Sequence, residues 1–267
     1  KGQALLIIVL VMVVALTVGL SVASRTITNL RNTREQVSSQ KALSSAEAGV
    51  EQAIKNNVSV GQTLSGNFSG NTTYSTTVIQ AGSGTSSFLL NGGSAVPKSD
   101  AIYVWLTPYS TNSANLWQNP WDGTLKVYWG NTSQSCNTPN SMPPALEIAV
   151  ITGSKVNPTV SRYAYDPCSA RQGVNNFSSP ISSVNTVSGT TLNYRADISV
   201  TNGLLVRVNP YYSTSNIGVS GSSAIPSQGN IISSTGVSDS STQRKVTVYQ
   251  GYPEIPAEFF PFILFSP

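Results

Sequence analysis

The sequence predicts an α+β protein, in which a long N-terminal α-helix is followed by an antiparallel β-rich globular domain that forms a sheet or a sandwich. Three observations support this fold class. The chain carries no charged residue from Ala4 to Ser24, and a helical period continues without proline to about Asn56. From there an alternating apolar and polar pattern with frequent turn residues begins. We therefore expect two parts, a helix over residues 1–56 and a β-rich domain over residues 57–267.

The first half of the predicted helix is apolar on every side. Its large apolar side chains are Leu5, Leu6, Ile7, Ile8, Val9, Leu10, Val11, Met12, Val13, Val14, Leu16 and Leu20. A run of this length reaches across the ~30 Å hydrocarbon core of a bilayer. The simplest interpretation is a single membrane anchor that tethers a folded domain outside the cell.

The second half of the helix is amphipathic, with two stripes of residues at steps of three and four. The first stripe consists of Ile27, Leu30, Arg34, Val37, Lys41 and Ser44, and the second of Leu43, Ala46, Val50, Ala53 and Ile54. A helix of about 80 Å is too long to lie entirely in a membrane, and its first half is too apolar to lie in water. We therefore expect partner subunits to cover the apolar run. The same partners are expected to cover a lower helix face formed by Ile27, Leu30, Val37, Leu43, Val50 and Ile54.

Both ends of this segment resemble the N-terminal helix of type IV pilin-like proteins. The chain opens with Lys1, Gly2 and Gln3 before the apolar run, and the helix ends with SAEAGVEQA over residues 45–53. This ending is similar to the Ala-Glu-Ala-Gly segment of minor pilins. The resemblance covers residues 1–55 and no motif beyond them.

The resemblance implies a filament subunit whose apolar helix lies first in the cytoplasmic membrane and later among identical helices in a filament core. The implied partners are further copies of the chain, a pilus assembly machinery and a prepilin peptidase that cleaves between Gly2 and Gln3. Most major pilins carry a glutamate four residues after the first mature residue. That position is Leu5 here if Lys1 is the first residue and Ile7 if Gln3 is, which favours a minor or divergent pilin.

The charge distribution argues against nucleic-acid binding and against catalysis. The chain holds 15 Lys and Arg, 11 Asp and Glu, and no His, for a formal net charge of +4. The basic excess lies in the N-terminal segment, and no basic cluster with interleaved aromatic residues follows it, so we expect no specific nucleic-acid partner. Without His, imidazole-based triads and zinc sites are excluded. Other catalytic motifs are also missing from the sequence, and we expect no enzymatic activity, metal or cofactor.

Beyond the helix, short alternating segments spaced by turn residues predict the strands of an antiparallel sheet or sandwich. These segments are residues 72–80, 86–90, 101–107, 124–129, 145–152, 160–165, 192–200, 204–209, 230–234 and 244–250. Residues 122–123 (Asp-Gly) and 201–203 (Thr-Asn-Gly) predict hairpin turns. The charge-free stretches 56–97 and 208–238 predict exposed, loop-rich coverings.

Cys136 and Cys168 are the two cysteines of the chain. An even count in an exported protein favours one disulfide, and two free thiols in a reducing compartment are the alternative. A zinc site is disfavoured because two thiols without His fall short of four ligands.

The four tryptophans, Trp105, Trp117, Trp121 and Trp129, lie close together in the sequence. One interpretation is a sugar-stacking or adhesive platform that exposes Trp117 and Trp121. The other is that Trp105 and Trp129 alternate into a core that Trp117 and Trp121 cover. The apolar C-terminal segment, residues 256–267, predicts a buried chain end.

These patterns together predict a structural subunit of an extracellular pilus-like filament. The subunit would reside in the cytoplasmic membrane before assembly and on the cell surface after it, where its Ser- and Thr-rich β domain is displayed and takes part in adhesion. The alternative is a monomeric, membrane-anchored adhesin or envelope surface protein.

Overall fold

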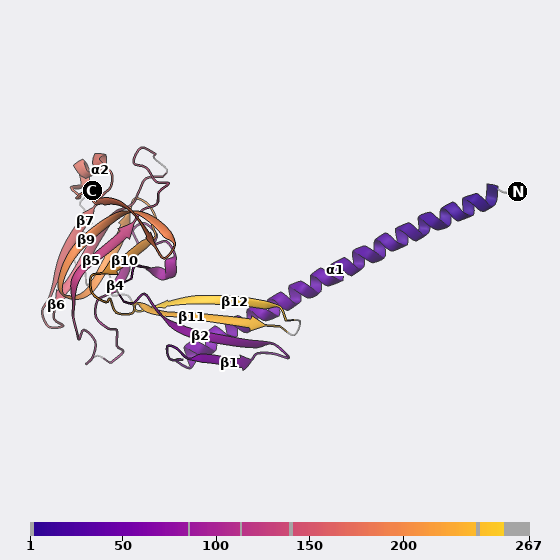
Figure 1. The fold of residues 1–267 in the computed structure, drawn as a ribbon, viewed down its shortest axis with the longest axis horizontal. Helices are drawn as coiled ribbons and strands as arrows, with labels where there is room; N and C mark the ends of the chain where they lie inside the picture. Colours follow the sequence, from indigo (N-terminus) through magenta and orange to yellow (C-terminus); the bar gives the residue numbers. More distant parts are fainter. Residues whose placement is uncertain (1–2, 85, 113, 139–140, 239–240, 254–267) are drawn as a thin grey trace. The chain divides into compact units, whose positions relative to one another are not determined.

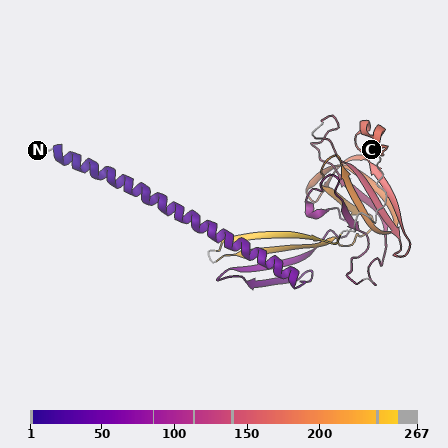
Figure 2. The same cartoon turned by 180° about the vertical axis from the view of Figure 1, so that it is seen from behind.

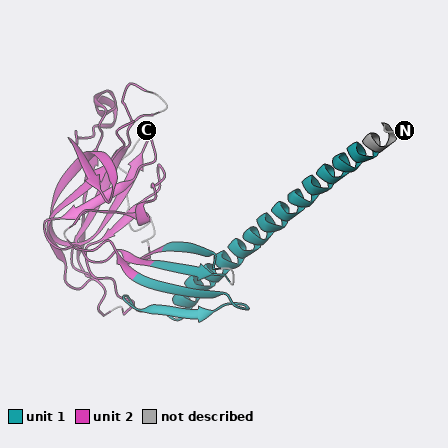
Figure 3. Ribbon diagram, turned by 45° about the vertical axis from the view of Figure 1, so that its right-hand side comes forward, with its two compact units in different colours: residues 1–78, 232–248 teal, residues 79–231, 249–267 magenta. Residues whose placement is uncertain are grey.

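The computed structural model describes residues 3–84, 86–112, 114–138, 141–238 and 241–253. It confirms the α+β class, because a long N-terminal helix is followed by antiparallel β-sheets (Figure 1). The chain forms two compact units, shown in teal and magenta in Figure 3. The first unit comprises residues 1–78 and 232–248, and the second comprises residues 79–231 and 249–267. The units therefore divide the chain differently from the expected boundary between residues 56 and 57.

The first unit consists of the helix α1 and a four-stranded sheet. α1 spans Gln3–Lys55, and its end lies within one residue of the predicted end at residue 56. The sheet order is β1-β2-β11-β12, and the strands are β1 (Thr63–Asn67), β2 (Thr73–Ala81), β11 (Gly229–Val237) and β12 (Gln243–Gly251). The last turns of α1 lie across one face of this sheet, the face turned toward the viewer in Figure 2.

Small residues allow α1 to lie very close to the sheet. The buried residues of its last turns are Ala42, Ser45, Ala46, Gly49, Val50 and Ala53. A Cβ atom on Gly236 of β11 would lie 2.6 Å from the backbone nitrogen of Ala46 and closer still to the carbonyl oxygen of Ala42. Larger side chains would hold the two backbones apart, so this spacing of small residues sets the distance between helix and sheet.

The buried hydroxyl groups between the helix and the sheet have hydrogen-bond partners. The Thr76 hydroxyl donates to Ser234 Oγ at 2.8 Å, and both residues are fully buried. Ser45 Oγ donates to the carbonyl oxygen of Thr73 at 2.8 Å. A buried hydroxyl without a partner costs about 1–3 kcal/mol, so these bonds explain how a Ser- and Thr-rich sheet face tolerates burial.

The second unit contains an eight-stranded sheet whose paired strands run antiparallel. Its main path is β3-β10-β5-β9-β6-β7, and β4 and β8 also pair with β9. The strands are β3 (Phe88–Leu89), β4 (Ile102–Trp105), β5 (Trp121–Trp129), β6 (Ala145–Gly153), β7 (Pro158–Tyr165), β8 (Ile181–Val187), β9 (Thr190–Tyr211) and β10 (Ile217–Gly221). Two short helices, η1 (Asn91–Gly93) and α2 (Ser169–Asn175), lie between strands.

The long strand β9 holds this sheet together. Its first half pairs with β8 and β5, and its second half pairs with β6 and β4. Ile198 from the first half and Val208 from the second belong to one apolar cluster. The two halves of β9 therefore contribute to the same main apolar core. Within that core Trp129 is fully buried, and its Nε1 donates to the carbonyl oxygen of Pro144 at 2.9 Å.

Both predicted hairpin turns are wrong. Residues 122–123 lie inside β5 and residues 201–203 lie inside β9, so the two predicted strands 192–200 and 204–209 are one continuous strand. The pairing register between β5 and β9 shifts at this point, which marks a β-bulge. Asn202 has a φ of 53°, and its backbone N–H donates to Asp122 Oδ1 at 2.7 Å. Residue types that favour turns here form one β-bulge, in which Thr201 and Asn202 of β9 lie opposite Asp122 of β5.

The stretches 56–97 and 208–238 are also not the loop-rich coverings that their composition predicts. They contain β1, β2, β3, β10 and β11. Ser and Thr are compatible with strands as well as loops, and Thr is β-branched. β1, β8 and β10 were not predicted because their apolar residues are few or do not alternate with polar ones. In ISSVNTV of β8 the apolar residues are three positions apart.

Replacing Gly236 by Ala should lower the stability of the first unit by about 1–3 kcal/mol, because the new methyl group meets backbone atoms of α1 that cannot rotate away. Gly19→Ala is the matched control, since nothing lies within 4 Å of a Cβ at that helical position. Thermal melting of the full chain in mild detergent, followed by circular dichroism, measures both. An unchanged melting temperature for Gly236→Ala would contradict the close packing.

Candidate assembly surface

The apolar first half of α1 is exposed over its whole described length. The large apolar side chains from Ile8 to Val22 are 53–68% exposed. Among the described residues, α1 is the one helix long and apolar enough to cross a membrane, with a mean hydropathy of 2.2 in its most apolar window. The predicted residues Ile8 to Leu20 thus form one continuous apolar surface.

Some predicted residues fall outside the described part of the chain. These are Gly2 and the side chains of Gln3, Leu5, Leu6 and Ile7, together with the apolar C-terminal segment 256–267.

Hydroxyl groups along α1 are bonded within the helix. Thr17 Oγ1 donates to the carbonyl oxygen of Val14 at 2.8 Å, and Thr26 Oγ1 donates to that of Val22 at 3.0 Å. Thr28 and Thr33 make the same bond to residues four positions earlier. A hydroxyl that bonds its own helix needs no water, so these residues suit lipid or a packed interface.

The structure separates the two predicted stripes of the lower helix. The second stripe packs on the sheet through Ala46, Val50 and Ala53, which are at most 6% exposed. The lower-face residues Ile27, Leu30, Val37, Leu43 and Ile54 are 41–56% exposed. Of the predicted lower face, only Val50 is therefore used inside the subunit, and the first stripe is left for contacts outside it.

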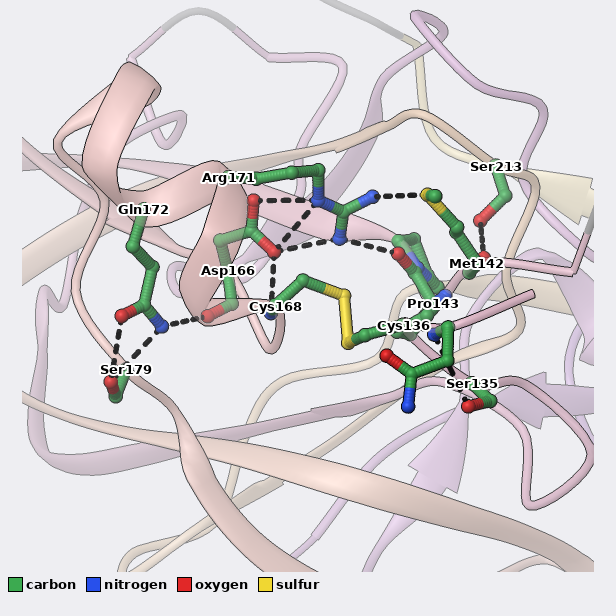
Figure 4. Close-up of a disulfide and its surroundings, with 12 residues drawn as sticks. Ser135, Cys136, Met142, Pro143, Asp166, Cys168, Arg171, Gln172, Ser179 and Ser213 are labelled. Carbon is green, nitrogen blue, oxygen red and sulfur yellow. Dashed lines mark hydrogen bonds and ion pairs between the residues drawn. A yellow bond between two sulfur atoms is a disulfide. The ribbon is translucent and has the colours of Figure 1, made fainter. Parts of the chain in front are cut away.

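In the second unit the predicted disulfide between Cys136 and Cys168 is present, with the two Cα atoms 5.5 Å apart (Figure 4). The buried carboxylate of Asp166 accepts hydrogen bonds from the Cys168 backbone N–H at 2.8 Å and from Arg171 Nη2 at 2.6 Å. Arg171 Nη2 also donates to the carbonyl oxygen of Pro143 at 2.8 Å. The disulfide and the ion pair between Asp166 and Arg171 thus stabilise the same loop region.

A second buried carboxylate, Glu147 on β6, lies in another polar network. Glu147 is 2% exposed, and its oxygens accept from Arg162 Nη1 at 3.0 Å and from the Tyr211 hydroxyl at 2.9 Å. Burial, followed by the nearby charge of Glu147, raises the pKa of Tyr211 above its ordinary value. Asp166 and Glu147 are both engaged in holding strands and loops in place.

The tryptophan positions require a correction. Trp121 is only 6% exposed, belongs to the main core, and donates its Nε1 hydrogen to the carbonyl oxygen of Ala224 at 3.0 Å. Its ring is therefore not available as part of an adhesive platform. Trp117 is half-buried and stacks on the buried Trp105, with ring centroids 5.0 Å apart.

Comparison of the chain with models of known protein families, with curated proteins and with solved structures finds no match. The structure itself shows a long apolar N-terminal helix, a β domain and one disulfide. The absence of enzymatic activity, metals and cofactors stays a prediction.

Replacing Cys136 and Cys168 together by Ser should lower the stability of the second unit by about 3–4 kcal/mol, because the bond closes a loop with a sequence separation of 32. Urea denaturation followed by tryptophan fluorescence measures the change. Wild-type protein in excess reductant is the control and should lose the same amount. Equal stability of the oxidised, reduced and double-Ser proteins would contradict a stabilising disulfide.

The raised pKa of Tyr211 predicts a loss of stability in alkali. Below pH 10.0, the ordinary tyrosine pKa, the phenol is protonated in both the folded and the unfolded chain and its contribution is complete. Above that pH the unfolded chain releases the proton while the folded chain retains it, so stability falls as pH rises. Urea titrations between pH 9 and pH 11 should show a shallower fall for Tyr211→Phe than for wild type. Equal slopes would refute this assignment.

Proposed function

We propose that this chain is a structural subunit of an extracellular, type IV pilus-like filament that assembles through α1 and displays the β units on its outside. The observation that carries the proposal is the exposed apolar surface of α1, which continues beyond the length that a membrane needs. The last turns of α1 pack on the sheet of the first unit, and the part of the helix before them is exposed to solvent. This arrangement is consistent with a pilin-like architecture.

The length of α1 supports the proposal. Its 53 residues rise about 80 Å, whereas the hydrocarbon core of a bilayer is ~30 Å thick. Ile27 and Leu30 come after Arg25, the first charge that follows the apolar run, and they are 55% and 56% exposed. A simple membrane anchor has no need of large apolar side chains at that point. Packing against other helices would remove them from water.

The same surface defines the proposed partners. Before assembly the apolar half of α1 would lie in the cytoplasmic membrane, where its internal backbone hydrogen bonds satisfy every polar group. Assembly would transfer it from lipid to identical helices. That transfer gains little hydrophobic free energy because lipid is itself apolar, so an energised assembly machinery is required. A prepilin peptidase acting between Gly2 and Gln3 completes the set of partners.

The alternative function is a monomeric, membrane-anchored adhesin or envelope protein. The apolar run from Ile8 to Val22 fits that function equally well, since a single span of this length anchors a protein. The two functions differ in what they require of the exposed stripe beyond Arg25. Only assembly needs it to be apolar.

Ile27→Asn combined with Leu30→Asn should abolish surface filaments while leaving the amount of chain in the membrane fraction unchanged. The control is Val174→Asn combined with Val184→Asn, at positions 85% and 70% exposed in the second unit. Immunolabelled electron microscopy of cells that make each variant, with membrane fractionation in parallel, measures both quantities. If the wild-type chain gives dispersed membrane particles and no helically repeated filament, the proposal fails.

A further inference from the structure

The second unit carries an apolar surface on the side of its sheet that is turned away from the main core. In β6, Ile148 and Val150 belong to the main core, whereas the alternate residues Ala149 and Ile151 belong to a separate cluster. Neighbouring residues of a strand point to opposite faces, so the two clusters lie on opposite sides of the sheet. We call the half-buried members of the second cluster the aromatic face, and they are Tyr103, Tyr109, Leu116, Trp117, Ile151 and Tyr252.

Aromatic rings hold one another in place on this face. Trp105 is 4% exposed, and the ring of Tyr252 lies edge-on to it, with ring centroids 6.3 Å apart. Tyr109 stacks on Tyr252 at 4.4 Å and meets Trp105 edge-on at 5.1 Å. Each ring buries part of its area against the others and leaves the rest for a further partner. Tyr252 is thus anchored on the aromatic face.

The chain continues from this anchor into its most aromatic stretch. Tyr252 and Pro253 are the last described residues, so residues 254–267 begin at the aromatic face. These 14 residues hold four of the seven phenylalanines of the chain, which are Phe259, Phe260, Phe262 and Phe265. A contiguous apolar surface of this kind calls for a cover.

The length of the segment is sufficient to cross the face. The strands β4, β9, β6 and β7 lie side by side in this part of the sheet, and at ~4.8 Å between neighbours they span about 14 Å. An extended chain of the length of residues 254–267 reaches about 45 Å at ~3.3 Å per residue.

The charges of the face and the segment are complementary. Arg162 of β7 and Arg207 of β9 both lie opposite the same residue of β6, so both arginines lie on the side of the aromatic face. With Glu147 of β6, which accepts a hydrogen bond from Arg162, they leave this side with one net positive charge. Residues 254–267 carry Glu254 and Glu258 and no Lys or Arg. The segment therefore brings carboxylates to a side of the sheet that carries arginines.

We propose that residues 254–267 pack across the aromatic face of their own chain and cover it. This inference concerns the second unit and does not depend on the proposed function. Chain continuity favours the segment's own face over that of a second copy, because a segment tethered at Tyr252 docks without the cost of bringing two chains together. Trp117 then contacts the segment and does not serve as an adhesive residue.

Photo-cross-linking tests the contact directly. Full-length chain in mild detergent carries p-benzoylphenylalanine in place of Phe260 or Phe262, and mass spectrometry identifies the peptides that irradiation joins. We expect cross-links to the peptides that contain Tyr103 and Ile151. In a mixture of isotopically labelled and unlabelled chains, these cross-links should join peptides of the same chain. The same photoreactive residue in place of Val184, which is 70% exposed on β8, is the control and should give none of them.

A substitution on the face measures how firmly the segment is held. Ile151→Asp places a carboxylate beneath an acidic, apolar segment. It should raise the rate at which chymotrypsin cleaves within residues 254–267 about tenfold, because cleavage requires the segment to detach. Ile151→Ser removes the apolar contact without adding charge and should give a smaller increase. Val184→Asp is the matched control and should leave the rate unchanged, and circular dichroism checks that each variant is folded.

Each alternative outcome overturns the inference. Cross-links that join only different chains show that copies exchange their segments. Cross-links to detergent or lipid, with none to the aromatic face, show that the segment enters a membrane. A cleavage rate that is the same for folded Ile151→Asp and wild type shows that the face does not hold the segment. None of these results depends on filaments, so failure of this inference and failure of the proposed function are distinguishable.

Discussion

The close approach of α1 to its sheet is the constraint on which the first unit depends. With Ala42, Ala46 and Gly49 on the helix and Gly236 on β11, the backbones come within a distance that no larger side chain allows. This contact fixes the rotation of the helix about its axis. Once that rotation is set, the stripe containing Ala46, Val50 and Ala53 faces inward and the stripe containing Leu30 and Val37 faces outward. The small residues in the contact between helix and sheet therefore determine which large apolar side chains of α1 remain exposed for contacts with partners.

Scarcity of charge has different consequences in the two units. In the first unit hydroxyl groups replace charges, and the buried pair Thr76 and Ser234 shows that hydroxyls can fill a helix-covered sheet face without orphaned polar atoms. In the second unit two of the few carboxylates, Asp166 and Glu147, are buried and paired with arginines. Breaking such a pair leaves a buried charge alone, which is costly. The rare charges therefore hold strands and loops in place.

The sequence predicted those elements in which apolar residues recur at a regular spacing. The end of α1 was predicted to within one residue because its apolar run and its stripes extend over many turns. The disulfide was predicted from the presence of two cysteines in the chain. Short strands without a regular alternation of apolar and polar residues, such as β8 and β10, carry no comparable signal. For Trp117 and Trp121 the sequence left two interpretations open, an adhesive platform and the cover of a core, because residue type does not reveal which face of a strand is buried.

The bulge at which Asp122 lies opposite Asn202 has a further consequence for how the second unit reaches its native pairing. A strand as long as β9, with four partners, can in principle slide by two residues along any of them and still bury the same kind of side chain. The hydrogen bond between Asn202 and Asp122 forms in one alignment alone. This bond fixes the pairing register midway along β9, at the point where its partner changes from β5 to β6. Matched insertions in both strands would preserve this alignment, whereas an insertion in one strand would displace half of the sheet relative to the other half.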